Sequence, residues 1–388
     1  MSKKILYCAS TASHILNFHL PYLQFFKEQG WQVDVAVAGE SEMPFVDNII
    51  SLPIRKNLLA FENLCAMVTL KEVIKKNNYD IISTHTALAG AIVRLAVLLT
   101  KKKHYGKMVH TSHGYFFNAK RKLNELPYLL VEKLLAPTTD MLMVMNKADY
   151  QLAMKYNLAK KLCLVPGMGI KLDKFTKADA EKKEQLRILA GFKPDDYLII
   201  YAAEMSKRKN HGELIEAVAQ TINEEPSIKL LLAGEGLLKD EHMKTVRQLG
   251  IEKHVCFLGH VANMEKWYAM SDCSITTSRC EGLPFNVMEA MASGLPVIAS
   301  RIKGHTDLLA KMEEDLLFDL GDVGQLKNKI LLFCRDTTLR IKVGTECSKE
   351  VLKYNLESVK PTILDCYQSI IPFSYAQKVK DLSFQARL

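Results

Sequence analysis

Two glutamates, Glu281 and Glu289, are separated by seven residues in the segment EGLPFNVME, and a helical pattern begins between them near Phe285. Free backbone N–H groups at a helix start bind anions, and Gly282 allows the chain to approach a ligand closely. Glu281, on the loop before the helix, could accept hydrogen bonds from a sugar ring. Glu289, about one turn inside the helix, could accept them from a ribose diol. Taken singly, Glu281 also fits an ordinary loop acid, and Glu289 a solvated helix residue.

Basic and imidazole groups occur at further positions where they could contact an anionic substrate. Lys207, Arg208 and Lys209 precede a helical pattern, and a cation there can stabilise a leaving group as its negative charge develops. A solvated cluster at a helix start is the alternative. His113, in the segment VHTSHGYFF, follows a predicted strand and stands beside a glycine. Parallel sheets place ligand contacts at that end of a strand, although a single histidine is often structural.

Strand and helix patterns alternate along both halves of the chain, which is typical of parallel sheets covered by helices. The first half carries helical patterns over Asn17–Gly30 and Leu88–Thr100. The sequence therefore predicts an α/β protein with two Rossmann-like parts. The predicted strands are Lys4–Ala9, Trp31–Ala38, Tyr79–Ser83, Lys107–Thr111, Met141–Met145, Tyr197–Ala202, Ile228–Ala233, Val255–Leu258, Cys273–Thr277 and Pro296–Ala299.

The length of 388 residues exceeds what one hydrophobic core usually serves, so we expect two domains. The segment VPGMGIKLD, residues 165–173, carries a proline and two glycines and marks a break between them. We expect an N-terminal domain over residues 1–170 and a C-terminal domain over residues 171–353. Ligands should bind at the carboxyl ends of the strands, in a cleft that both sheets face.

Composition and cysteine usage fit a cytoplasmic globular protein, with 48% hydrophobic and 24% charged residues. The longest apolar run, Ala87–Leu99, is shorter than the roughly 18 residues that cross a bilayer and contains Arg94. The N-terminus lacks the apolar core and cleavage site of a signal peptide. Nine cysteines without a CxxC pair fit small core residues better than disulfides or a zinc site.

The formal charge of +9 is unevenly distributed along the chain. Residues 1–170 hold 21 Lys and Arg against 12 Asp and Glu, and the basic excess includes the stretch from Arg94 to Lys133. A solvated surface would explain this excess. The alternative is a surface for an anionic membrane or a lipid-linked substrate. Nucleic acid is not expected as a partner, since no recognised binding motif accompanies the charge.

The text from Ser278 to Ser300, SRCEGLPFNVMEAMASGLPVIAS, resembles the E-x7-E signature region of the family 4 glycosyltransferases, which have the GT-B fold. The resemblance implies that Glu281 and the backbone from Gly282 to Asn286 contact the transferred sugar and phosphates. It implies that Glu289 holds the ribose of the nucleotide. It also implies two Rossmann-like domains whose parallel sheets face an interdomain cleft.

Further segments resemble that family along nearly the whole chain. AEMSKRKNHGELIEA resembles the segment that brings cations to the donor diphosphate, with Lys209 at the position of the family's lysine. Glu204 replaces an arginine common in relatives, so the second cation is assigned to Arg208. The segments AGEG, VCFLGHV, IKGHTDL and STASHILNFHLP resemble a glycine turn, a base-recognition strand, and two loops of polysaccharide transferases. His305 and Asp307, or His14, Asn17 and His19, could face substrate in those two loops, or serve packing and capping.

The site implied by the resemblance has a catalytic group and a donor-binding group of residues. The catalytic group is His113, Arg208, Lys209 and Glu281. The donor-binding group is Gly234, Gly259, His260, Val261, Gly282, Leu283, Pro284, Phe285, Asn286 and Glu289.

The implied activity is retaining transfer of a hexose or N-acetylhexosamine from a nucleotide sugar, UDP-linked, to a polyprenyl-diphosphate-linked glycan. Expected partners are thus the nucleotide sugar, the lipid-linked acceptor and an anionic membrane on the inner face of the cell. No metal or cofactor is expected, because the chain has no D-x-D triplet. A segment over about 354–388 should cross back to the first domain. A nucleotide-sugar epimerase of the same fold and a non-catalytic membrane scaffold are the alternatives.

Overall fold

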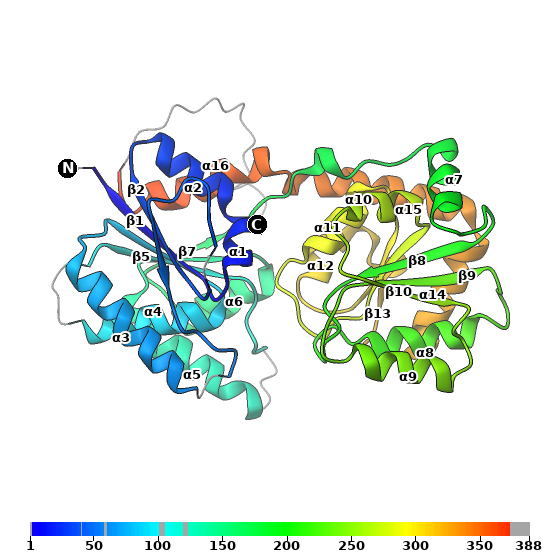
Figure 1. Cartoon of the computed structure of the whole chain (residues 1–388), viewed down its shortest axis with the longest axis horizontal. Coiled ribbons are helices and arrows are strands. Elements are labelled where there is room, and N and C mark those ends of the chain that lie inside the picture. The colour runs from blue at the N-terminus through cyan, green and yellow to red at the C-terminus, as the bar shows by residue number, and fades with distance from the viewer. Residues whose placement is uncertain (1, 40, 58–59, 101–104, 119–122, 373–388) are drawn as a thin grey trace. The chain divides into compact units, whose positions relative to one another are not determined.

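The computed structural model describes residues 2–39, 41–57, 60–100, 105–118 and 123–372, and Figure 1 shows its two β-sheets, each flanked by helices. The chain folds into two compact units. The first unit comprises Met1–His110, Thr138–Met141 and Leu364–Leu388, and the second comprises Thr111–Pro137 and Leu142–Ile363. The domain bounds expected from the sequence stay a prediction.

The first sheet has seven strands in the order β3-β2-β1-β4-β5-β6-β7. Leu6 of β1 lies opposite Asp34 of β2 on one side and Ile82 of β4 on the other, both in parallel register. The order reverses direction between β1 and β4. The strands are β1 (Lys4–Cys8), β2 (Gln32–Val37), β3 (Asn48–Ser51), β4 (Ile81–His85), β5 (Lys107–Ser112), β6 (Met141–Val144) and β7 (Lys161–Leu164).

The helix predicted over Asn17–Gly30 is wrong in its bounds, because the structure has two helices there. α1 (Ala12–Phe18) ends before His19, and α2 (Leu20–Glu28) starts anew with Pro21 in its first turn. Proline lacks an N–H and fits the first turn of a helix but not its interior, which explains the break. The other helices up to residue 160 are α3 (Phe61–Lys76), α4 (Ala87–Leu99), α5 (Leu126–Leu135) and α6 (Lys147–Tyr156).

One hydrophobic core of the first unit lies between its sheet and the helices α3 and α4. Buried apolar side chains of both helices, such as Leu70 and Val93, belong to one cluster with Leu6 of β1 and Ile82 of β4. Burial of this kind stabilises the fold by about 25 cal/mol per Å² of apolar surface. The same packing holds the carboxyl ends of β1 and β4 at one edge of the sheet.

The second sheet has six strands in the order β10-β9-β8-β11-β12-β13, all parallel. Ile199 of β8 pairs with Leu230 of β9 and with Cys273 of β11, so the strand order reverses between β8 and β11. The strands are β8 (Tyr197–Ala202), β9 (Ile228–Ala233), β10 (Val255–Gly259), β11 (Cys273–Thr276), β12 (Val297–Ser300) and β13 (Leu317–Phe318). The α/β class predicted from the sequence is confirmed.

The last helix, α16 (Leu356–Gln368), has residues in both units, since the second unit ends at Ile363 and the first resumes at Leu364. Residues 373–388 of the predicted crossover segment lie outside the described residues. Within the described part of the chain, no helix is long and apolar enough to cross a membrane. The remaining helices are α7 (Ala180–Leu189), α8 (His211–Thr221), α9 (Lys239–Gln248), α10 (Met264–Met270), α11 (Phe285–Ala292), α12 (His305–Leu308), α13 (Glu313–Leu316), α14 (Val323–Arg335) and α15 (Thr337–Val351).

Candidate functional site

Three of the predicted catalytic residues meet at the switch point of the second sheet. Lys209 follows β8, Glu281 follows β11, and the Lys209 Nζ atom lies 2.6 Å from the Glu281 Oε1 atom. The Arg208 Nη1 atom donates to the same oxygen at 2.9 Å and to the Cys280 carbonyl at 3.1 Å. Ligands of doubly wound sheets bind at such a reversal of strand order. Two cations and one carboxylate therefore stand where an anionic ligand is expected.

Hydrogen bonds between the two loops fix this arrangement. The Tyr201 hydroxyl of β8 donates to the Lys209 carbonyl at 2.8 Å and also contacts the Ser278 hydroxyl at 2.9 Å. The Thr277 hydroxyl donates to the Asn210 carbonyl at 2.8 Å. Buried hydroxyls at the strand ends therefore hold the loop after β8 against the loop after β11.

The carboxyl group of Glu281 is 9% exposed and is ionised in this setting. Burial alone would raise its pKa, but the charges of Lys209 and Arg208 outweigh burial and hold the pKa below the usual value. The carboxylate thereby pairs with both cations. An incoming diphosphate would compete with Glu281 for them.

Glu289 has the opposite electrostatic setting. It lies in α11, which begins at Phe285 as predicted, and burial raises its pKa to about 7. The Tyr268 hydroxyl donates to the Glu289 carboxylate at 3.4 Å, a weak contact that offsets burial only in part. Near neutral pH this carboxyl group is thus divided between its charged and neutral forms.

The loop that carries His113 packs directly against the Glu281 loop within the second unit. A Cβ atom placed on Gly282 would lie 2.0 Å from the His113 carbonyl oxygen, and one on Gly114 would lie 2.9 Å from the Gly282 Cα atom. Only glycine allows backbones to approach this closely. The structure therefore brings His113 beside Glu281 and Gly282, as the sequence order alone could not establish.

The other predicted donor residues lie along the same edge of the second sheet. Gly234 follows β9 and donates its N–H to the carbonyl of Gly259, the last residue of β10, at 2.7 Å. His260 and Val261 follow at the end of β10, and the His260 side chain is exposed. Leu283, Pro284, Phe285 and Asn286 form the end of the loop and the first turn of α11. The roles of these residues stay predictions.

Two residues of the IKGHTDL segment have packing and capping contacts. The His305 ring is fully buried with Nδ1 2.8 Å from the Ser300 carbonyl, and burial lowers its pKa to about 4. The Asp307 carboxylate accepts the Lys147 backbone N–H at 2.7 Å, at the start of α6. These are contacts of packing and capping, and a role of either side chain toward a substrate stays a prediction.

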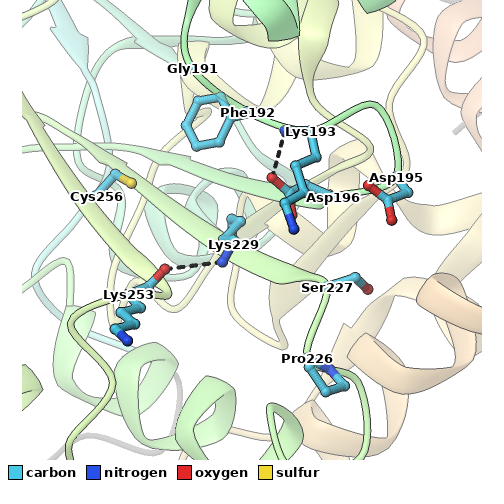
Figure 2. A pocket seen from close by; sticks show the side chains of 10 residues that line it. All are labelled: Gly191, Phe192, Lys193, Asp195, Asp196, Pro226, Ser227, Lys229, Lys253 and Cys256. Atoms are coloured by element: carbon cyan, nitrogen blue, oxygen red, sulfur yellow. Dashed lines mark hydrogen bonds between the residues drawn. The ribbon is translucent and has the colours of Figure 1, made fainter.

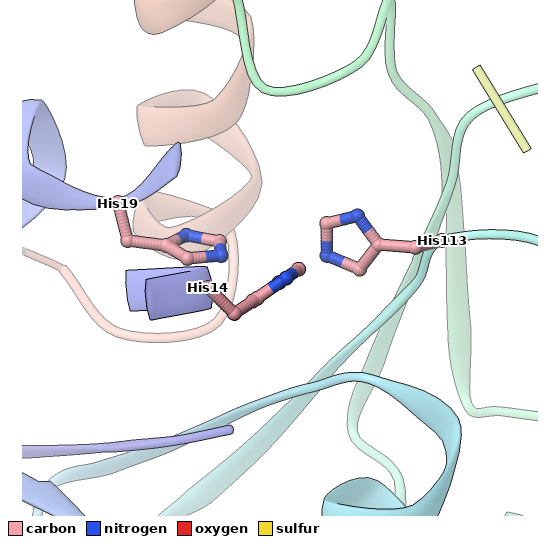
Figure 3. A group of neighbouring side chains, drawn as sticks. All are labelled: His14, His19 and His113. Atoms are coloured by element: carbon pink, nitrogen blue, oxygen red, sulfur yellow. The ribbon is translucent and has the colours of Figure 1, made fainter. Parts of the chain in front are cut away.

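The histidines of the N-terminal loop lie in the first unit. The His14 and His19 rings, drawn in Figure 3, have centroids 5.1 Å apart, and His19 is fully buried at the start of α2 without capping it. Burial lowers the pKa of His14 to about 4. Asn17 is exposed. Whether any of the three contacts an acceptor stays a prediction.

A separate hollow of the second unit lies at the opposite edge of its sheet. Figure 2 shows its lining residues beside the amino-terminal ends of β8, β9 and β10. Lys229 there donates to the Lys253 carbonyl at 3.0 Å, and the Lys193 N–H donates to Asp196 at 2.9 Å. The predicted site residues follow the carboxyl ends of these strands, so this hollow lies away from them.

Three polar residues with largely buried side chains lie close to the site and were not among the predicted residues. Lys303, Asp149 and Asn146 form a hydrogen-bonded network that reaches the Gly282 carbonyl. Lys303 stands inside the quoted IKGHTDL segment, but nothing in the local pattern marks it as buried.

Comparisons with known proteins cover both halves of the chain. The model "Glycosyl transferases group 1" matches residues 182–349, and "Glycosyl transferase 4-like" matches residues 4–146. EpsD of Bacillus subtilis (strain 168), named as a glycosyltransferase, is 34% identical over 381 residues, covering 97% of this chain and 100% of EpsD. The Escherichia coli UDP-Gal:alpha-D-GlcNAc-diphosphoundecaprenol alpha-1,3-galactosyltransferase is 26% identical over 322 residues, covering 81% of this chain and 82% of that protein.

Solved structures with the same fold include two that match nearly the whole chain. Sucrose-phosphate synthase from Thermosynechococcus elongatus has a TM-score of 0.78 at 19% identity, covering 95% of this chain and 98% of that one. Anabaena HepE in complex with UDP and glucose has a TM-score of 0.75 at 18% identity, covering 95% of this chain and 100% of that one. At these identities the likeness concerns the fold.

Proposed function

Because this chain belongs to the family 4 glycosyltransferases and has their GT-B fold, we propose that it transfers a hexose or N-acetylhexosamine from a UDP-sugar. The acceptor in this proposal is a polyprenyl-diphosphate-linked glycan for a bacterial surface polysaccharide. The observation that carries the proposal is the meeting of Arg208, Lys209 and Glu281 at the switch point. The activity for which the Escherichia coli relative is named supports the acceptor, and the UDP bound to HepE supports the donor.

The proposed reaction retains the configuration of the sugar. The bond between the anomeric carbon and the donor phosphate oxygen breaks, and an acceptor oxygen bonds to that carbon on the same face. The acceptor proton passes to the leaving diphosphate. Lys209 and Arg208 stabilise the charge that develops on this diphosphate, while Glu281 and His113 orient the sugar. Two fixed cations supply the positive charge, so we expect no need for a divalent ion.

The test is transfer from a panel of radiolabelled UDP-sugars to a membrane lipid extract, with and without EDTA. We expect label from one donor in the lipid fraction, at a rate that EDTA leaves within about twofold. Conversion of a donor to its epimer without transfer would favour the epimerase. No turnover of any donor, with the Glu281→Ala variant behaving identically, would favour the non-catalytic scaffold.

The ionisation of Glu289 predicts a pH dependence of nucleotide binding. Ribose hydroxyls donate to the carboxylate, so binding favours its charged form, and a pKa of about 7 leaves part of the free protein protonated. Raising the pH from about 6 to about 8 should therefore tighten UDP binding, at most about tenfold for each pH unit below the pKa. Isothermal titration calorimetry at both pH values measures the change.

The Glu289→Gln variant serves as the control for that experiment. Ionisation of UDP itself affects both proteins alike, so the difference between their pH profiles belongs to Glu289. We expect weaker binding by the variant and a flatter profile. Identical profiles for the two proteins would contradict an ionised Glu289 in the nucleotide site.

The membrane part of the proposal rests on α5, whose last turn carries Lys133 of the basic stretch. Arg94 of that stretch is fully buried, so it belongs to no charged surface. Leu126, Leu130 and Leu134 lie on one face of α5 and are 38%, 56% and 61% exposed. Leu123, just before the helix, is 92% exposed. Exposed apolar side chains on a helix that also carries a lysine suit the interface of an anionic bilayer. We place the protein on the cytoplasmic face of the membrane by this surface.

We expect binding to vesicles of phosphatidylcholine and phosphatidylglycerol that weakens as sodium chloride is raised. Replacing Leu130 and Leu134 with serine should weaken it by about tenfold or more, from the lost apolar burial. Flotation or cosedimentation measures the bound fraction. The exposed leucines Leu189 and Leu237, replaced likewise, form the control. Salt-independent binding, or equal loss in the control, would rule out this surface.

A further inference from the structure

Lys303, in the loop between β12 and α12, has its side chain 9% exposed and bonded only to protein groups. Its Nζ atom donates to the Tyr115 carbonyl at 2.6 Å, to the Phe117 carbonyl at 3.0 Å and to the Asp149 carboxylate at 2.8 Å. A lysine ammonium has three donors. All three are used within the protein, so Lys303 has none left for a substrate.

The partner carboxylate of Lys303 is fully buried and fully used. The Asp149 Oδ1 atom accepts from Lys303, and its Oδ2 atom accepts the Tyr115 backbone N–H at 3.0 Å and the Asn146 amide at 2.8 Å. Asn146 caps α6 through the Asp149 backbone N–H. Its amide also donates to the Gly282 carbonyl at 3.3 Å. The network thus joins the His113 loop, the start of α6 and the Glu281 loop.

Backbone packing extends this connection to the loop that carries Lys303. Gly304 has a φ of +88°, and a Cβ atom on it would lie 2.4 Å from the Gly282 carbonyl oxygen. Gly282 therefore lies between Gly304 on one side and the His113–Gly114 backbone on the other. A shift of the Lys303 loop would be transmitted to both site loops, because close-packed backbones leave no room to absorb it.

We propose that Lys303 is a positioning residue, which holds His113 and Glu281 in register through its bonds to Tyr115, Phe117 and Asp149. This inference rests on the proposed function, because the alignment of His113 and Glu281 is taken to orient the transferred sugar. A buried charged pair is weak evidence for stability, since desolvation offsets its attraction. This pair joins two loops of the site, so its contribution is to fix their relative positions instead.

The test compares Lys303→Met with Arg187→Met, a matched control in the same unit. Arg187 also donates to one buried carboxylate, Asp272 at 2.5 Å, and to two carbonyls, those of Met270 and Pro194. That pair lies at the opposite edge of the sheet. A loss of register in the site should lower kcat by about 10- to 100-fold, with the KM for the donor little changed. Arg187→Met should lower Tm similarly but keep kcat within about twofold.

Hydrogen exchange gives a readout that does not depend on activity. In Lys303→Met, amides of residues 111–118 should exchange faster, since the Tyr115 carbonyl loses its donor and Lys303 no longer holds the Asp149 carboxylate that accepts the Tyr115 N–H. Arg187→Met should leave them unchanged. Lys303→Arg keeps the positive charge, but a guanidinium does not carry three N–H donors on one nitrogen atom. We therefore expect this variant to fold normally and to have an intermediate kcat. Unchanged exchange and kcat in both Lys303 variants, or an equal kcat loss in Arg187→Met, would overturn the proposal. An unmodified protein without transfer would overturn the proposed function, and exchange alone would then decide whether Lys303 positions the loops.

Discussion

Replacing Lys209 with methionine is expected to lower kcat/KM for sugar transfer by about 10²- to 10³-fold, the usual cost of removing one preorganised donor to a developing negative charge. The Nζ atom lies 2.6 Å from Glu281 and the side chain is only 11% exposed, so water cannot easily replace the lost cation. Affinity for UDP should fall in the same variant, because the diphosphate loses a direct partner. Initial rates at limiting donor and calorimetry with UDP measure the two effects.

Lys207→Met is the matched control for this experiment. Lys207 stands two positions earlier in the same loop after β8, but it is exposed. Its removal changes the net charge equally, so a loss seen in both variants would reflect long-range attraction of the donor. We expect Lys207→Met to keep kcat/KM within about threefold, the modest effect of an exposed charge. If Lys209→Met lowered kcat/KM no more than Lys207→Met does, the role assigned to Lys209 would be contradicted.

The parts of the fold that follow from short-range patterns were predictable. β8 and β9 have the predicted bounds, Tyr197–Ala202 and Ile228–Ala233, because β8 is one continuous apolar run and β9 is apolar apart from Lys229. The start of α11 at Phe285 follows from Pro284 just before it. Short strands such as β3 and β13 have no such run, and the sequence pattern missed them.

The residues of the candidate site were also predictable only where they belong to short-range patterns. Glu281 and Lys209 belong to local motifs, and their contact follows once parallel strands place both loops at one edge. Lys303 and Asp149 are 154 positions apart, and no periodicity connects them. A buried lysine is also the opposite of what composition rules favour. Such a pair is visible only after the chain has folded.

Glu204 stands where relatives commonly have an arginine, and the structure partly explains how the site still has two cations. Its side chain is exposed, while the Arg208 guanidinium lies 2.9 Å from the Glu281 carboxylate. The second cation of the site therefore comes from the position directly before Lys209. Its contact with the donor diphosphate stays a prediction, which the Lys209 experiment can be extended to test.

Replacing Glu281 with glutamine should separate sugar transfer from nucleotide binding. The variant loses the carboxylate that we propose orients the sugar, so we expect kcat to fall by about 10²- to 10³-fold. The same change frees Lys209 and Arg208 from their intramolecular partner, which the lowered pKa of Glu281 identifies as charged. UDP binding should therefore hold or tighten by a few-fold. Single-turnover rates with the UDP-sugar and calorimetry with UDP give the two quantities.

The opposite signs of the UDP effects distinguish the two roles at one site. Lys209→Met removes attraction for the diphosphate, whereas Glu281→Gln removes a competitor for the same cation. Only Lys209→Met should therefore weaken UDP binding. Glu225→Gln is the control for a lost carboxylate, because Glu225 forms an exposed ion pair with Arg335 at 2.6 Å. If Glu281→Gln weakened UDP binding as much as Lys209→Met does, the carboxylate would be holding the cations in place for the donor. In that case Glu281 would serve the diphosphate site through Lys209 and Arg208, and orientation of the sugar would have to come from other groups.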